Sequence, residues 1–315
     1  MNNFFEKCER DINLADHTTF KIGGPADYFY IAKNQEDLIE ALKSVKEEGI
    51  KYYVLGGGSN VLVSDEGFRG LVIKIELDNL DIKENIIIVG AGVSVGKIVS
   101  KALDNNLTGM EFFTGVPGTI GGAIFGNAGA YGSDASKILK SVSYYDVNAD
   151  KIIKKEINNL DFSYRSSEFK NDKNKIVLSC EIELKKSDRN KIIAEMSDIA
   201  KQRGTKIPNE PSAGSVFKNV TKDLTQILNK LDTDNTDKIK FKKYGKIPAA
   251  LLIEKSGLKG RQVGGAKVSE KHTNFIVNIG FAKAKDVLDL VEIVKTQVKI
   301  KFGVELELEN ILVGF

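Results

Sequence analysis

The sequence contains no tryptophan and, among its 315 residues, only two cysteines (Cys8, Cys180), two histidines (His17, His272) and five prolines. The cysteines and histidines lie too far apart for a zinc finger or zinc ribbon, whose ligands come in closely spaced pairs, and we expect no metal site. Two distant cysteines do not make a disulfide scaffold, so we expect a reducing compartment, the cytoplasm. Cys180 is expected to be a buried strand residue and Cys8 to have no functional role.

The sequence also lacks long apolar runs and a strong charge of one sign. No run approaches the ~18 residues that a membrane span requires, and the N-terminal segment is charged too early for a secretory signal. Lys+Arg 46 and Asp+Glu 43 leave a net charge of +3, too small a surplus for a dedicated nucleic-acid binder. We therefore expect a soluble enzyme of about two domains that binds neither nucleic acid nor membrane.

Strand-like and helix-like patterns alternate along the first third of the chain. At 35–48, Leu38, Leu42 and Val45 share one helical face, and Gly49 stands where a C-terminal cap belongs. This rhythm predicts an α/β or α+β domain. The predicted strands are 51–55, 71–75, 86–90, 141–147, 176–184 and 274–279, and the predicted helices are 35–48, 95–104, 190–203, 247–256 and 284–301.

The composition changes near residue 187, where we place a boundary before a smaller α+β domain. The stretch 232–246 (DTDNTDKIKFKKYGK) is predicted to be a charged, solvated loop.

Glycine is concentrated in two segments. GGGSN at 56–60 follows a predicted strand, and GVPGTIGGA covers 115–123 within the longer glycine-rich segment 109–132. Consecutive backbone N–H groups that no side chain covers form an anion-binding nest, and two such loops suit a dinucleotide diphosphate better than one phosphate. GAGVSV at 90–95 lacks the third glycine of a Rossmann fingerprint, so we interpret it as a plain strand–turn–helix.

Seven blocks in one order carry a family resemblance: 17–29, 55–65, 109–132, 164–170, 206–219, 252–278 and 302–314. Together they resemble the UDP-N-acetylenolpyruvoylglucosamine reductases, which use FAD and NADPH to complete UDP-N-acetylmuramate for peptidoglycan. The segment after 164–170 is short, which resembles the type II branch and implies that the tyrosine-bearing loop of the long branch is absent or different.

The resemblance implies an α+β fold: a two-subdomain FAD-binding fold of the vanillyl-alcohol-oxidase type and a smaller substrate-binding domain. We assign 1–75 to FAD-binding subdomain 1, with 302–315 returning near it, 76–187 to subdomain 2 and 188–301 to the substrate-binding domain. FAD is expected to be bound non-covalently, with NADPH as co-substrate and the protein as a monomer. The cofactor-binding residues expected are Gly56, Gly57, Gly58, Ser59, Asn60, Gly115, Pro117, Gly118, Thr119, Gly122 and Gly129.

Three residues match the family's catalytic positions: Arg165 in YRSS, Ser215 in SAGSVFKN and Glu309 in LELEN. A cation beside the substrate carboxylate would stabilise the negative charge that develops there, and a hydroxyl near C2 could donate the quenching proton. Because Leu308 stands where the family has proline, Glu305 and Glu307 are alternatives to Glu309. We favour Glu309, on a strand with Leu306 and Leu308.

For the substrate, the resemblance implies Arg203, Lys206 and Asn219 at the UDP diphosphate. Lys259 and His272 are expected to line the same cleft, although His272 could equally be structural.

Two other functions remain open from the sequence. One is an oxidase of the same flavin fold that acts on an alcohol or sugar, and the other is a non-catalytic nucleotide-binding module. Many such oxidases hold flavin covalently through His or Cys, and neither residue occurs within 109–132.

Overall fold

The computed structural model describes residues 3–315 and divides into two compact units. The first unit comprises the residues up to Ile12, Ala26–Gly57 and Phe68–Thr205, and the second comprises Asn13–Pro25, Gly58–Gly67 and Lys206–Phe315. The chain therefore leaves the first unit for good after Thr205 and not near residue 187. The reason is helix α5, which runs unbroken over Arg189–Lys206.

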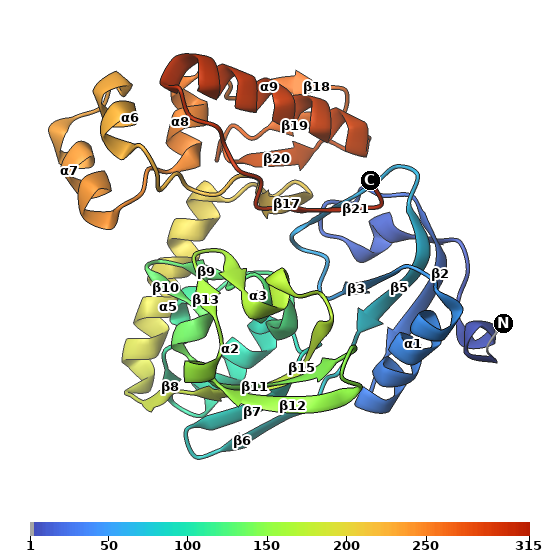
Figure 1. Ribbon diagram of the computed structural model, residues 1–315. Coiled ribbons are helices and arrows are strands. Elements are labelled where there is room, and N and C mark those ends of the chain that lie inside the picture. Colours follow the sequence, from blue (N-terminus) through green and yellow to red (C-terminus); the bar gives the residue numbers. More distant parts are fainter. Residues whose placement is uncertain (1–2) are drawn as a thin grey trace. The chain divides into compact units, whose positions relative to one another are not determined.

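The first unit contains a parallel sheet in which β5 (Phe68–Ile75) lies between β2 (Pro25–Ala32) and β3 (Tyr52–Leu55). Helix α1 (Gln35–Glu48) packs against this sheet (Figure 1) and ends at Gly49, whose φ of 66° is left-handed. The face predicted from Leu38, Leu42 and Val45 is buried. Strand β3 ends at Leu55, so the glycine loop begins at the next residue, Gly56.

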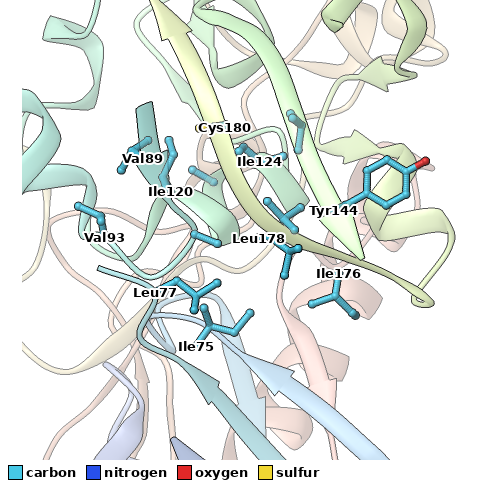
Figure 2. Packing of buried hydrophobic residues seen from close by; sticks show 14 of the residues in the cluster. Ile75, Leu77, Val89, Val93, Ile120, Ile124, Tyr144, Ile176, Leu178 and Cys180 are labelled. Carbon is cyan, nitrogen blue, oxygen red and sulfur yellow. The ribbon is translucent and has the colours of Figure 1, made fainter. Parts of the chain in front are cut away.

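A second, antiparallel sheet of the first unit has the strand order β12-β11-β15-β7-β6. Its strands pack with helices α2 and α3 into a core in which side chains such as Val89, Ile120, Ile124 and Leu178 lie together (Figure 2). Cys180 belongs to the same core on β15 and is buried, as expected. The elements are β6 (Leu80–Lys83), β7 (Ile86–Gly90), α2 (Val95–Asp104), α3 (Ile120–Phe125), β11 (Leu139–Asp146), β12 (Lys151–Glu156) and β15 (Lys175–Glu183).

Shorter elements complete the first unit. Two of its pairs form small hairpins around the glycine-rich segment and around Arg165. The elements are β8 (Leu107–Thr108), β9 (Gly129–Ala130), β10 (Ser133–Asp134), β13 (Phe162–Ser163), β14 (Ser166–Ser167), α4 (Glu168–Asn171) and β16 (Lys185–Lys186). The short strand β1 (Ile12–Asn13) lies where the chain first passes to the second unit.

The second unit has an antiparallel sheet of order β17-β20-β19-β18 and a core of its own. The predicted valine stripe of helix α9, which includes Val287, Val291 and Val298, is buried in that core. The elements are β17 (Ser212–Ser215), α6 (Leu224–Lys230), α7 (Asn235–Tyr244), α8 (Ala249–Lys255), β18 (Gln262–Val263), β19 (Ala266–Val268), β20 (Phe275–Asn278) and α9 (Ala284–Phe302).

The prediction of a solvated loop at 232–246 is wrong, because α7 occupies most of that stretch. Asp234 caps the helix by accepting from the backbone N–H of Asp237, and Gly245 ends it at a φ of 64°. Phe241 is buried in the core of the second unit. Because lysines surround Phe241 in the sequence, the stretch has the composition of a charged loop, and its one buried side chain is not recognisable from the sequence.

The C-terminal strand β21 (Ile311–Val313) pairs in parallel with β4 (Val61–Val63) inside the second unit. The strand begins only at Ile311, so the expectation that Glu309 lies on it is wrong. Leu308 forms an isolated bridge with Phe217 instead.

Candidate active site

A cavity of about 510 Å³ in the first unit lies where the two glycine loops meet. Gly56 and Gly57 from the first loop and Thr119 from the second line it, together with Gly92 of the GAGVSV turn. Charged side chains complete the lining: Lys33, Lys74, Glu76 and Asp78. Within the first unit, the two loops therefore form one cavity that carries both cations and carboxylates.

The two loops approach each other so closely at Gly56 and Gly57 that neither position has room for a side chain. A Cβ on Gly56 would lie 2.7 Å from Thr119 Oγ1, and one on Gly57 would lie 2.6 Å from Gly118 Cα. Thr119 Oγ1 also accepts from the N–H of Gly122 and caps α3. An anionic diphosphate is bound by uncovered backbone N–H groups, by the N-terminus of a helix and by nearby cations. The cavity offers all three, with Lys33 and Lys74 as the cations, so it fits a dinucleotide cofactor.

Other expected cofactor residues have structural reasons of their own. Gly58 has a φ of 64°, and a Cβ there would collide with the carbonyl oxygen of His17 within the second unit. A Cβ on Gly129 would collide with the carbonyl oxygen of Ser133. The carbonyl oxygen of Gly115 accepts from Arg203 Nη2 at 3.0 Å. Ser59 and Asn60 belong to the second unit, whereas Pro117 and Gly118 belong to the first.

Arg165 lies in the tight turn between β13 and β14 of the first unit, with a left-handed φ of 56°. Its guanidinium donates from Nη2 to the carbonyl oxygen of Gly129 at 2.8 Å and from Nη1 to that of Asn127 at 3.5 Å. Lys170 Nζ donates to the carbonyl oxygen of Arg165. The guanidinium is therefore fixed by backbone carbonyls of the glycine-rich segment.

Ser215 and Glu309 lie close together in the second unit. The N–H of Glu309 donates to the carbonyl oxygen of Val216 at 2.8 Å, and Asn310 Nδ2 lies 3.2 Å from the carbonyl oxygen of Ser215. Asn60 Nδ2 donates to the carbonyl oxygen of Glu309 at 3.2 Å. Three distant segments thus converge, and they bring two of the three predicted catalytic residues together.

The two alternatives to Glu309 are surface residues. Glu305 pairs with Lys299, and its side chain is 67% exposed. Glu307 pairs with Lys218 and is 66% exposed. Glu309 is partly buried beside Ser215, so the geometry favours it over both neighbours.

The expected substrate residues fall in both units. Arg203 belongs to the first, whereas Lys206, Asn219, Lys259 and His272 belong to the second. Asn219 Oδ1 accepts from the N–H of Ala249, and Lys259 makes a long ion pair of 3.9 Å with Glu254.

His272 is held in place by its neighbours. Its Nδ1 accepts from the N–H of Asn274, and its ring meets the edge of Phe275. Burial lowers the pKa of His272, and the positive charge of Lys206 acts in the same direction, so the ring is neutral near pH 7.

Sequence reasoning missed the charged lining of the cavity and the asparagines that hold the site. Lys33, Lys74, Glu76 and Asp78 lie in ordinary-looking strand ends and turns, where no motif marks them. Asn127 could have been noticed, because it lies inside the glycine-rich segment and asparagine tolerates its φ of 42°. Asn310 carries no such local signal.

No helix within residues 3–315 is long and apolar enough to span a membrane. The same residues contain no group of three or more His, Cys, Asp or Glu side chains placed to hold a metal ion.

The fold and cavity define an FAD-binding protein of the α+β class. The sequence-family model of the FAD binding domain matches residues 26–151. The family model of the UDP-N-acetylenolpyruvoylglucosamine reductase C-terminal domain matches residues 206–313. The chain belongs to the UDP-N-acetylenolpyruvoylglucosamine reductase family.

Similar proteins cover nearly the whole chain. The reductase of Clostridium novyi is 40% identical over 98% of this chain and 93% of its own, and that of Bacillus subtilis is 38% identical over 96% and 92%. The crystal structure of the Thermus caldophilus reductase superposes with a TM-score of 0.78 at 32% identity and covers 97% of this chain and 98% of that one.

The expected activity is confirmed. The protein is an FAD- and NADPH-dependent oxidoreductase that reduces UDP-N-acetylglucosamine enolpyruvate to UDP-N-acetylmuramate in peptidoglycan synthesis. The alternatives of an alcohol or sugar oxidase and of a non-catalytic module are therefore set aside.

Proposed function

We propose that Arg165, Ser215 and Glu309 carry the chemistry of this reduction. Bound FAD supplies the transfer of hydride from NADPH to the vinyl carbon C3 of the enolpyruvyl group. Negative charge then develops on C2 and its carboxylate, where a fixed guanidinium is worth most. Arg165 provides that charge, and Ser215 donates the proton that C2 takes up.

Glu309 has a different part in the proposal. An ionised carboxylate beside a developing negative charge would repel it, so Glu309 acts in its protonated form and donates a hydrogen bond to the substrate carboxylate. The closeness of Glu309 to Ser215, through the bonds at Val216 and Asn310, supports a shared task. Finding Glu309 ionised at neutral pH in a complex with a substrate analogue would remove this role.

The cavity in the first unit is our proposed site for the adenosine diphosphate part of non-covalently bound FAD. The observation that carries it is the close approach of the two glycine loops, in which a Cβ on Gly56 would lie 2.7 Å from Thr119 Oγ1. Lys33 and Lys74 offset phosphate charge, and Glu76 and Asp78 are acceptors for ribose hydroxyls. FMN lacks the adenosine half, so Glu76→Ala, which removes the acceptor, should weaken FAD binding and leave FMN binding unchanged. Equal loss for both flavins would contradict this placement.

Further parts of the proposal concern the substrate and the assembly. Arg203, Lys206, Asn219, Lys259 and His272 bind the uridine diphosphate end, and NADPH and substrate use one pocket in turn. The protein works as a cytoplasmic monomer, for which light scattering of the purified protein should give the chain mass of 34.6 kDa. A mass of twice that value would overturn the monomer.

The catalytic roles are tested by following the two half-reactions separately. NADPH bleaches the yellow enzyme, and the enolpyruvyl substrate restores the colour. Arg165→Ala should slow recolouring about 10²–10³-fold and leave bleaching nearly unchanged, because only the second step develops charge on the carboxylate. Arg189→Ala is the matched control, since Arg189 also donates to a carbonyl oxygen, that of Leu103. Equal slowing of both steps, or of neither, would contradict the role of Arg165.

A further inference from the structure

Asn127 stands at a junction of three segments in the first unit. Its side chain is buried, and its φ of 42° is left-handed. Its Nδ2 donates to the carbonyl oxygen of Ser163 at 2.9 Å, and its Oδ1 accepts from the N–H of Ser136 at 3.1 Å. One amide thus joins the glycine-rich segment to β13 and to the turn after β10.

The same hairpin is fastened at a second point. Ser167 Oγ on β14 donates to the carbonyl oxygen of Phe125 at 2.7 Å. Ser167 and Ser163 flank the turn that carries Arg165, so both strands of the hairpin are bonded to the segment that begins at Phe125. The guanidinium of Arg165 binds carbonyl oxygens of that same segment, at Asn127 and Gly129.

The backbone of Arg165 needs such support. A left-handed φ costs a residue other than glycine roughly 1–2 kcal/mol, so the turn would relax if its anchors were lost. A displacement of about 1 Å of a group that stabilises a transition state can cost about 10²-fold in rate. Loss of the bonds made by Asn127 and Ser167 should therefore change the position of the guanidinium more than the folding of the unit.

We propose that Asn127 and Ser167 are positioning residues that hold the guanidinium of Arg165 in its working place. This inference rests on the proposed role of Arg165. It assigns a function to Asn127, a left-handed residue of the glycine-rich segment that the sequence analysis did not use.

The test uses the FAD-loaded enzyme and the two half-reactions. Asn127→Asp keeps the side-chain shape, the tolerance of a left-handed φ and the acceptor for Ser136, but it removes the donor to Ser163. We expect recolouring by the enolpyruvyl substrate to slow about 10- to 100-fold at saturating substrate, with NADPH bleaching changed less than about twofold. Ser167→Ala should act in the same way, and it keeps the proposal testable if Asn127→Asp does not fold.

Ser166→Ala is the matched control. Ser166 lies on the same hairpin, but its Oγ donates to Asn171 at 3.2 Å and has no bond to the segment from Phe125 to Ser136. Its recolouring rate should equal that of the unmodified enzyme. Rates are measured well below the melting temperature of each variant, so that a loss of stability changes neither half-reaction.

A double variant decides whether Asn127 acts through Arg165. In the Arg165→Ala background, Asn127→Asp should slow recolouring by less than about twofold more, because the group that it positions is gone. The full 10- to 100-fold slowing in that background would overturn the positioning role. Normal recolouring of both Asn127→Asp and Ser167→Ala would also overturn it, while Arg165→Ala remained slow. If Arg165→Ala itself recolours normally, the proposed role of Arg165 fails first, and the positioning role falls with it.

Discussion

Asparagine side chains hold the predicted catalytic residues in both units, but over very different distances along the chain. In the first unit, the Asn127–Ser163 bond that steadies the Arg165 hairpin joins residues 36 apart. In the second unit, the Asn60–Glu309 bond joins residues 249 apart, and Asn310 binds Asn60 Oδ1 at 2.8 Å. One predicted catalytic position is therefore built locally, and the other is built from three distant segments.

The difference matters because long-range contacts must offset more loop-closure entropy before they form. Asn310 Nδ2 lies within hydrogen-bond distance of the carbonyl oxygens of Ala213 and Ser215 as well as of Asn60. A single side chain thus holds the segment that contains Ser215 against the segment before β21. Damage to this junction should affect the stability of the second unit, whereas damage to the Arg165 hairpin should chiefly affect one rate.

The largest effect is expected at Ser215. Ser215→Ala removes the proposed proton donor, so recolouring by the enolpyruvyl substrate should slow about 10²–10⁴-fold while NADPH bleaching stays nearly normal. Stopped-flow absorbance should show the variant accumulating in its bleached form. Ser215→Cys should recover part of the rate, because a thiol can still donate a proton. Slow bleaching with normal recolouring would move the acid to Glu309.

The next effect concerns the cofactor cavity. A Cβ on Gly122 would meet only Thr119 Oγ1, at 3.6 Å, so a side chain fits there, in the first turn of α3. Gly122→Asp places a carboxylate near the proposed diphosphate. Like charges about 4–8 Å apart cost about 2–4 kcal/mol at an effective dielectric constant of 20, or about 30- to 1000-fold in Kd. Fluorescence titration with FAD measures this loss.

Gly122→Ala is the control, because it adds the Cβ without the charge. Its FAD affinity should stay within about threefold of the unmodified protein. A fully yellow Gly122→Asp protein would mean that the diphosphate lies elsewhere.

A smaller effect separates the two junctions directly. Asn310→Asp removes the donor to the carbonyl oxygens of Ala213 and Ser215, which should lower the free energy of unfolding by about 1–3 kcal/mol. Asn127→Asp should cost less stability, because it removes a donor to a single carbonyl oxygen, that of Ser163. Urea unfolding of the two FAD-loaded variants makes the comparison. A larger loss for Asn127→Asp would contradict the contrast between long-range and local construction.

The smallest effect is a pH-dependent change in stability at Glu168, the first residue of α4, which follows directly after the Arg165 hairpin. Burial alone would raise the pKa of Glu168, but its bonds to Lys175 and Lys155 lower it below the ordinary value. A lowered carboxyl pKa stabilises the fold above about pH 4.3, and the stabilisation is lost as pH falls through the folded value. Glu168→Gln should cost about 1 kcal/mol at pH 7 and flatten the acid side of the stability curve. An unchanged acid side of the stability curve would show that these two ion pairs of Glu168 contribute nothing.

Local signals in the sequence predicted much of the first unit. Helix α2 occupies 95–104 as expected because Ser94 caps it and Val95, Ile98 and Val99 make one buried face. The strand–turn–helix interpretation of GAGVSV is confirmed in the same place. The arrangement around Ser215 and Glu309 could not be predicted from spacing, because it depends on pairing between β21 and β4, hundreds of residues apart.

The misses have related causes. Helix α7 has one buried anchor, Phe241, among lysines, so its periodicity is too weak to recognise. Lys33 and Lys74 line the cavity because of how the strands are arranged in space, and the composition of the sequence carries no information on that arrangement. Only the resemblance to a family pointed to Arg165, Ser215 and Glu309, since none of the three stands in a motif that is specific by itself.

One measurement on the unmodified protein tests the central claim most directly. The purified protein should be yellow, should bleach when NADPH is added without oxygen, and should regain its colour when UDP-N-acetylglucosamine enolpyruvate follows. Recolouring should also deliver one UDP-N-acetylmuramate for each bleached enzyme. A protein that bleaches but regains its colour only with oxygen, or that bleaches with a simple alcohol or sugar in place of NADPH, would contradict the account.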